Sequence, residues 1–214
     1  MNTGISAALP AHFVITIGRS FGAGGRELGR LLAERLGVAY YDKKLLVEAA
    51  QVAGMDAAFF EKNDERAPGF FSSSLPMGFG YAHFAGPGAL GSETIYRAQS
   101  DFIRDIAMKG PCIIVGRTAD YVLRDFPGLL SIFLHAPEDV CIKRILNRED
   151  CKDENSARAI LRKTNKMRAE FYNFYSDKTW GEAATYHLSF DTSKLSMTAI
   201  ADIIINYLNS CKQP

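Results

Sequence analysis

The sequence lacks the features that mark several classes of protein. Its 25 basic and 24 acidic residues nearly cancel, leaving a net charge of +1 over 214 residues, so no overall positive field would hold a nucleic acid without sequence preference. No apolar run approaches the roughly 20 residues that a bilayer-spanning helix needs. Residues 1–12 also lack the basic start and apolar centre of a signal peptide. We therefore expect a cytoplasmic protein without a nucleic-acid or membrane partner.

Patterns for metal binding and for disulfides are missing as well. The four cysteines include no CxxC pair, and the four histidines include no i, i+4 pair. Scattered cysteines in a chain of this length do not make a disulfide framework, and zinc ligands usually recur at short, fixed spacings. We expect no metal ion held by protein ligands.

What the sequence does contain is an alternation of apolar runs with helical patterns, in a composition typical of a globular protein. This alternation is typical of βαβ units and of a parallel sheet with helices on both faces. Leucines recur at helical spacing over 28–36, and Gly37 follows as a C-terminal stop. We expect strands at 13–17, 38–41, 112–115, 129–134 and 186–190, and further helices at 43–53, 92–109, 137–149, 155–178 and 196–210.

One segment, residues 66–91, has neither a helical nor a strand period. It is crowded with Gly, Pro, Ser and Phe, and long connections of this kind inside compact domains are usually functional or mobile. One interpretation is an insertion whose phenylalanines pack on the body or on a second subunit. The other is a flap that closes over a ligand, with stacking candidates Phe70, Phe71, Phe79 and Tyr81.

Glycines gather where the first expected strand meets the first expected helix. Four of them stand between residues 18 and 25, in the string GRSFGAGGRE at 18–27. Glycine lets backbone N–H groups point inward, and a helix N-terminus adds about half an elementary positive charge. The context predicts a phosphate site, with a tight turn made for packing as the alternative. The candidate nucleotide-binding residues are Gly18, Ser20, Gly22, Ala23, Gly24, Gly25, Arg26 and Glu27.

The string departs from the standard P-loop, GxxxxGK[ST], in which a lysine reaches the phosphates and a hydroxyl contacts Mg²⁺. Counted from Ser20, Arg26 takes the lysine position and Glu27 the hydroxyl position. Arginine could supply the charge, although it is not interchangeable with lysine. Glu27 would either contact a metal or turn away as a helix-start residue.

Five landmarks in order resemble the cytidylate kinase-like branch of the P-loop nucleoside monophosphate kinases. They are GRSFGAGGRELG at 18–29, YYDKKLL at 40–46, CIIVGRTADYVL at 112–123, TWG at 179–181 and FDTS at 190–193. The spacing from Glu27 to Asp42 is also that of the family, and in this ungapped register Gly25, rather than Arg26, takes the lysine position. The alternative registers of the loop stay open.

The resemblance, which covers roughly residues 13–210, implies an α/β P-loop kinase fold in three layers. Its five-stranded parallel sheet would have helices on both faces and carry a helical lid. It further implies an ATP-dependent transferase with ATP and Mg²⁺ as cofactors, the metal bound through the nucleotide, and nucleotides as ligands. A homodimer is an open option. The implied organisation is a single domain over 1–214, with a phosphate-loop unit at 13–54, a flexible acceptor-side insertion at 55–92 and a lid region at 143–178.

By the same resemblance, Asp42 would lie near the acceptor or the metal, and Arg117 would grip an acceptor phosphate, which suits a guanidinium. As alternatives, Asp42 could simply cap the following helix, and Arg117 could form a surface ion pair. Thr118 stands where true cytidylate kinases carry an aspartate, Asn165 where an acidic residue usually precedes the lid arginine, and His187 where the family tends to have aspartate. These departures bear on cytosine recognition and on the family's standard chemistry.

The lid candidate is basic. Residues 143–168 hold nine basic side chains against four acidic ones, a local net charge of +5, which suits the charge that develops in phosphoryl transfer. Arg144 and Arg148 have the i, i+4 spacing of one helix face, and Arg168 matches the family's lid arginine. A solvated basic helix face is the alternative. The candidate catalytic residues are Arg26, Arg144, Arg148 and Arg168, and the candidate substrate-binding residues are Asp42, Arg117 and Arg162.

The sequence therefore supports three hypotheses of different classes. The first is a phosphotransferase that moves a phosphoryl group from ATP to a CMP-like nucleoside monophosphate or another small acceptor. The second is a nucleotide-binding sensor without chemistry, favoured by the missing lysine and hydroxyl. The third is a scaffold that uses its Phe-rich segment as an interface.

Overall fold

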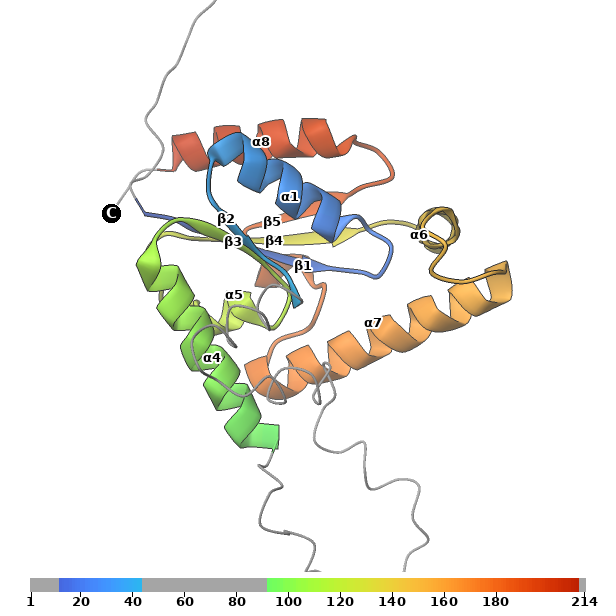
Figure 1. The fold of residues 1–214 in the computed structure, drawn as a ribbon, viewed down its shortest axis with the longest axis horizontal. Coiled ribbons are helices and arrows are strands. Elements are labelled where there is room, and N and C mark those ends of the chain that lie inside the picture. The colour runs from blue at the N-terminus through green and yellow to red at the C-terminus, as the bar shows by residue number, and fades with distance from the viewer. Residues whose placement is uncertain (1–11, 44–91, 212–214) are drawn as a thin grey trace, which may run out of the picture.

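The computed structural model describes residues 12–43 and 92–211, which form a five-stranded parallel sheet between two layers of helices (Figure 1). The strand order is β2-β3-β1-β4-β5, so β1 lies at the centre and pairs in parallel with β3 and β4. The fold class expected from the sequence is confirmed. The strands are β1 (Val14–Arg19), β2 (Ala39–Tyr41), β3 (Cys112–Val115), β4 (Leu129–His135) and β5 (Leu188–Asp191).

The helices divide between the two faces of the sheet. One face carries α1 (Gly25–Leu36) and α8 (Met197–Ser210), and the other carries α4 (Ser92–Lys109), α5 (Ala119–Val122) and α7 (Glu154–Ser176) (Figure 1). The short α6 (Glu138–Asn147) follows β4, and a 3-10 turn (Ala183–Thr185) precedes β5. No helix in the described ranges is long and apolar enough to cross a membrane.

Two apolar clusters hold these layers together. Ile15 and Ile17 of β1 pack with α1 and α8 on one face, whereas Val14 packs with α4 and α5 on the other. A central parallel strand is covered on both faces, so it reads as a continuous apolar run rather than an alternating one. This burial fixes the carboxyl ends of β1, β3 and β4 at one edge of the sheet, where ligands bind in open α/β folds.

Several boundaries differ from the sequence expectation in ways that affect the site. β1 continues to Arg19, so Gly18 and Arg19 belong to the strand, and α6 ends at Asn147, so Arg148 lies beyond the helix. The short helix α5 was not expected. The expected helix at 43–53 beyond Lys43, the segment 66–91 and the insertion at 55–92 up to residue 91 lie outside the described residues.

Candidate functional site

The connection between β1 and α1, residues 20–24 together with Gly25, is called here the glycine bend. Gly22 and Gly24 both have left-handed backbone conformations, with φ of 82° and 87°, which only glycine adopts readily. A Cβ atom on Gly22 would also lie 2.8 Å from the carbonyl oxygen of Cys141 in α6. The bend is therefore pressed against a neighbouring helix at a point where a side chain does not fit.

Part of the backbone of the glycine bend is bonded to the protein, and part is not. The amide of Ser20 donates to the Leu134 carbonyl at 2.9 Å, and that of Phe21 donates to Oδ1 of Asn165 at 2.7 Å. The amides of Gly22, Gly24 and Gly25, by contrast, have no acceptor within residues 12–43 and 92–211. Such amides at the start of a helix attract an anion, because they join unsatisfied donors to the positive end of the helix dipole.

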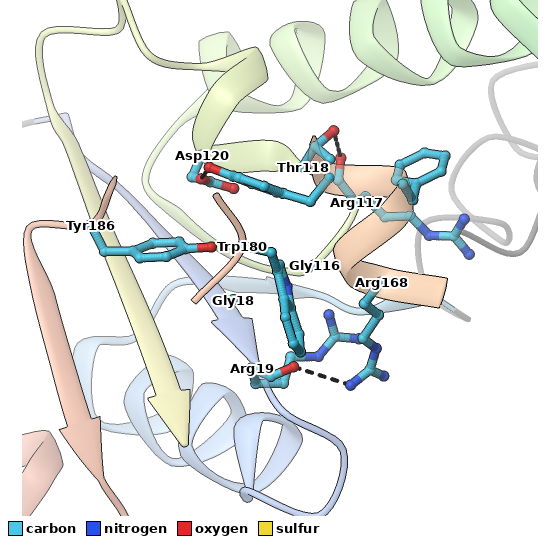
Figure 2. Close-up of a pocket in the computed structure, with 11 residues that line it drawn as sticks. Gly18, Arg19, Gly116, Arg117, Thr118, Asp120, Arg168, Trp180 and Tyr186 are labelled. Atoms are coloured by element: carbon cyan, nitrogen blue, oxygen red, sulfur yellow. Dashed lines mark hydrogen bonds between the residues drawn. The ribbon is translucent and has the colours of Figure 1, made fainter. Parts of the chain in front are cut away.

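A small pocket, open to solvent, lies beside the glycine bend (Figure 2). Its lining comes from the end of β1, the turn after β3, helix α7 and the segment before β5. Three arginines line it, Arg19, Arg117 and Arg168, against one carboxylate, Asp120. The pocket is therefore electropositive and suits an anionic ligand.

The turn after β3 is a strained backbone segment. Gly116, Arg117 and Thr118 have successive φ values of 83°, 61° and 50°, and left-handed conformations are uncommon for residues other than glycine. The Thr118 hydroxyl donates to the Arg117 carbonyl at 2.7 Å and lies 3.2 Å from the Tyr96 hydroxyl of α4. Arg117 is only 5% exposed. Strain of this kind persists where surrounding packing holds it and gathers at functional sites.

Helix α7 is tied to the glycine bend by two residues one turn apart. Asn165 accepts the Phe21 amide, and Nη1 of Arg168 donates to the carbonyl of Arg19 at 3.2 Å (Figure 2). The guanidinium groups of Arg168 and Arg148 lie 5.7 Å and 5.6 Å from the centroid of the Phe21 ring, which is within reach of a cation–π contact. The basic lid region is thereby drawn toward the bend.

Aromatic and acidic groups form the opposite side of the pocket. The Tyr172 hydroxyl donates to Oδ2 of Asp120 at 2.6 Å. Burial raises the pKa of the Asp120 carboxyl, and the hydrogen bond from Tyr172 offsets part of this rise. Burial, followed by the negative charge of Asp120, raises the pKa of both Tyr172 and Tyr186. Trp180 packs edge-on against Phe133, with ring centroids 5.2 Å apart.

The structure brings some of the expected site residues together. Gly18, Arg117 and Arg168 line the pocket, and Ser20, Gly22, Ala23, Gly24 and Gly25 form the bend beside it.

Other expected residues do not line the pocket. Arg26, whose side chain is 66% exposed, has its Nε 3.9 Å from Oδ2 of Asp42, and Glu27 is exposed at the start of α1. Asp42 is buried and accepts a hydrogen bond from the Tyr40 hydroxyl at 3.3 Å, and it does not line the pocket. Burial raises the pKa of Tyr40 to about 12.

The remaining lid arginines contact protein groups. Arg144 donates to the hydroxyl of Thr192 at 2.7 Å and to its carbonyl at 2.8 Å. Arg148 pairs with Asp150 at 3.0 Å, and Arg162 pairs with Glu138 at 3.2 Å. Arg148 directly follows the last residue of α6, and the side chains of Arg144 and Arg148 contact different groups.

Several residues of the site were not singled out from the sequence, among them Arg19, Asp120 and Tyr172. Arg19 stands within the glycine-rich string, and its strand-end position was the available signal. Asp120 and Tyr172 are 52 positions apart, and no local pattern links them. In the described parts of the chain, no group of three or more His, Cys, Asp or Glu side chains could hold a metal ion.

The fold and the glycine bend define a protein of the P-loop kinase type. The chain belongs to the cytidylate kinase-like family, whose model matches residues 14–194. No curated protein matches it in sequence.

Among solved structures, an uncharacterized protein from Eubacterium ventriosum is 30% identical, with a TM-score of 0.70 over 94% of this chain and 100% of its own. A shikimate kinase from Bacteroides thetaiotaomicron is 16% identical, with a TM-score of 0.53 over 92% of this chain and 98% of its own. A gluconokinase from Sinorhizobium meliloti is 15% identical, with a TM-score of 0.50 over 92% of this chain and 91% of its own. At these lower identities the likeness to the two kinases is one of fold.

Proposed function

We propose that the protein is an ATP-dependent phosphotransferase that acts on a small anionic acceptor, with a CMP-like nucleoside monophosphate as the first candidate. The observation that carries the proposal is a single juxtaposition. Three amides that find no acceptor among the described residues, those of Gly22, Gly24 and Gly25, stand beside a pocket that three arginines line. A phosphate donor and an anionic acceptor could thus meet at one edge of the sheet.

The glycine bend fits the polyphosphate of ATP. The amides of Gly22, Gly24 and Gly25 would donate hydrogen bonds to phosphate oxygens, and the start of α1 would add the positive end of its dipole. Mg²⁺, bound through the nucleotide's own phosphates, would neutralise part of their charge. Because Arg168 contacts the backbone of Arg19 at the entrance to the bend, its guanidinium can approach a phosphoryl group that leaves the bend for the pocket.

The pocket fits an acceptor that joins a negative group to a flat ring. Arg117, buried and held in a strained turn, would fork onto a phosphate or carboxylate. A base or sugar ring could pack against the aromatic wall of the pocket. This wall consists of Phe171, Tyr172, Trp180 and Tyr186. When the acceptor is already a phosphate, the reaction needs positioning and cationic charge rather than a strong general base.

The test is a measurement of ADP release with a panel of acceptors. The panel should hold CMP, UMP and AMP as phosphate acceptors, and shikimate and gluconate as carboxylate-bearing hydroxyl acceptors. We expect turnover with at least one of them, and a raised KM for that acceptor in Arg117→Met. A folded protein that binds ATP and releases no ADP with any acceptor would contradict the proposal.

A second candidate is a nucleotide sensor without chemistry. It is favoured by the sequence of the loop. Neither a lysine nor a hydroxyl residue stands at positions 25–27, where a standard P-loop carries both. A ligand that binds the native state raises its apparent stability. Thermal stabilisation by ATP without any transfer would therefore favour the sensor over the enzyme.

A further inference from the structure

The position that a P-loop lysine would occupy is filled by another side chain. Gly25 is the first residue of α1, and the three atoms nearest to a Cβ added there all belong to Arg19, with Cγ at 2.8 Å and Cβ and Cδ at 3.2 Å. Gly25 is not among the residues with positive φ, so its backbone would accept a side chain without strain. The stem of Arg19 is what excludes one.

The far end of the same side chain reaches the turn after β3. A Cβ atom added to Gly116 would collide with Nη1 of Arg19 and would lie 2.9 Å from its Cζ and 3.1 Å from its Nη2. Arg19 thus runs across the mouth of the site, from the first residue of α1 to the strained turn that carries Arg117. Its guanidinium ends in the pocket lining, and Arg168 contacts its backbone (Figure 2).

An alignment of the sequence with the P-loop motif agrees with this position of Arg19. When GxxxxGK is aligned so that its lysine falls on Gly25, its last glycine falls on Gly24 and its first glycine falls on Arg19. Arginine therefore stands at position 19, where the motif has a glycine, and glycine stands at position 25, where the motif has its lysine. The two changes are sterically linked, because Arg19 and a side chain at position 25 compete for the same space.

We propose that Arg19 is the phosphate-binding cation of this site and replaces the P-loop lysine from the end of β1. Its ligand is a di- or triphosphate held by the glycine bend, at the side that faces the acceptor pocket. The inference rests on the proposed function for its ligand. Arg26, by contrast, lies near Asp42, is largely exposed and does not line the pocket.

The test exchanges the two positions. Arg19→Ala, Gly25→Lys and the double variant Arg19→Ala/Gly25→Lys are compared with the wild type by calorimetric titration with ATP and with inorganic triphosphate, together with ADP release. Arg35→Ala is the matched control, because it removes the same charge from the distal end of α1, where Arg35 pairs with Asp202. Arg19→Met, which keeps the stem, serves if Arg19→Ala does not fold.

We expect Arg19→Ala to weaken triphosphate binding about tenfold to hundredfold, the range for loss of one charged hydrogen bond. Gly25→Lys alone should bind no better than wild type and should melt earlier, because the two side chains collide. The double variant should recover affinity to within about threefold of wild type, a rescue that a purely structural role for Arg19 would not produce. Arg35→Ala should bind as wild type does.

Two results would overturn the inference while leaving the proposed function intact: undiminished triphosphate binding by Arg19→Ala or Arg19→Met, or a double variant that stays as weak as Arg19→Ala. Rescued binding in a protein that transfers no phosphoryl group would uphold the role of Arg19 and refute the transferase. A wild-type protein that binds neither ATP nor triphosphate would refute both.

Discussion

Replacing Arg168 and Arg144 in turn by methionine should separate two roles within the basic lid region. Both substitutions remove one guanidinium and keep a long apolar stem. Arg168 lines the pocket and donates to the Arg19 carbonyl, whereas Arg144 makes its two hydrogen bonds to Thr192, at the end of β5. We expect the loss of Arg168 to affect catalysis and the loss of Arg144 to affect mainly stability.

The magnitudes follow from these contacts. A hydrogen bond to a charged group contributes about 1.5–3 kcal/mol, so the loss of an Arg168 contact with the transferring phosphoryl group should lower kcat/KM by about 10- to 150-fold. Arg144→Met leaves the backbone carbonyl of the buried Thr192 without its donor, at a cost of about 2 kcal/mol. For a chain of this length, that corresponds to a fall in Tm of about 4–8 °C.

The assay is ADP release at a temperature where both variants are folded, together with thermal unfolding of each. The expected pattern is a large loss of kcat with a small loss of ATP affinity in Arg168→Met, since lid cations act mainly in the transition state. Arg144→Met should lose far less activity and more stability. Equal losses of kcat in the two variants, or an unchanged kcat in Arg168→Met, would refute the assignment.

Three further predictions concern the bend and the pocket wall. Gly22→Ala should lower Tm more than Gly37→Ala: both have positive φ, but only the Gly22 substituent would meet Cys141, and the space around Gly37 is open. Asn165→Ala should lower the free energy of unfolding, measured in urea, by about 1 kcal/mol, because the Phe21 amide loses its acceptor. Asp120→Asn should gain stability relative to wild type as pH rises above 3.8. The folded state, with its raised pKa, holds the Asp120 proton more tightly than the unfolded state does, so wild-type stability from this group falls as pH rises through that pKa. Urea titrations from pH 3.5 to 7 that show a constant or reversed difference would contradict this.

Much of the fold could be predicted because its signals are local. The apolar runs at Cys112–Val115 and Leu129–His135 are buried strands, and their hydrophobicity needs no knowledge of the neighbours. The glycine bend could be predicted equally well, because four glycines at a strand-to-helix connection are typical of a phosphate site. Its order along the chain, strand then bend then helix, is enough to predict an anion site.

Which of the arginines line the pocket could not be predicted in the same way. Arg144 and Arg168 look alike in sequence, and only the contacts of Arg144 with Thr192 and the packing of α7 against the bend decide which one faces the pocket. The side chain of Arg19 needs the space that two glycines leave open. Gly25 follows it closely in the sequence, whereas Gly116 comes nearly a hundred residues later. Local periodicity carries no information about such convergence.

The most direct test of the central claim is an NMR titration of isotope-labelled protein with Mg²⁺ and ATP. The glycine bend should bind the polyphosphate through its main-chain amides, so the N–H resonances of Gly22, Gly24 and Gly25 should shift strongly. The resonance of Gly37, at the other end of α1, should stay in place. Saturating ATP that leaves the three bend amides unmoved would contradict the account.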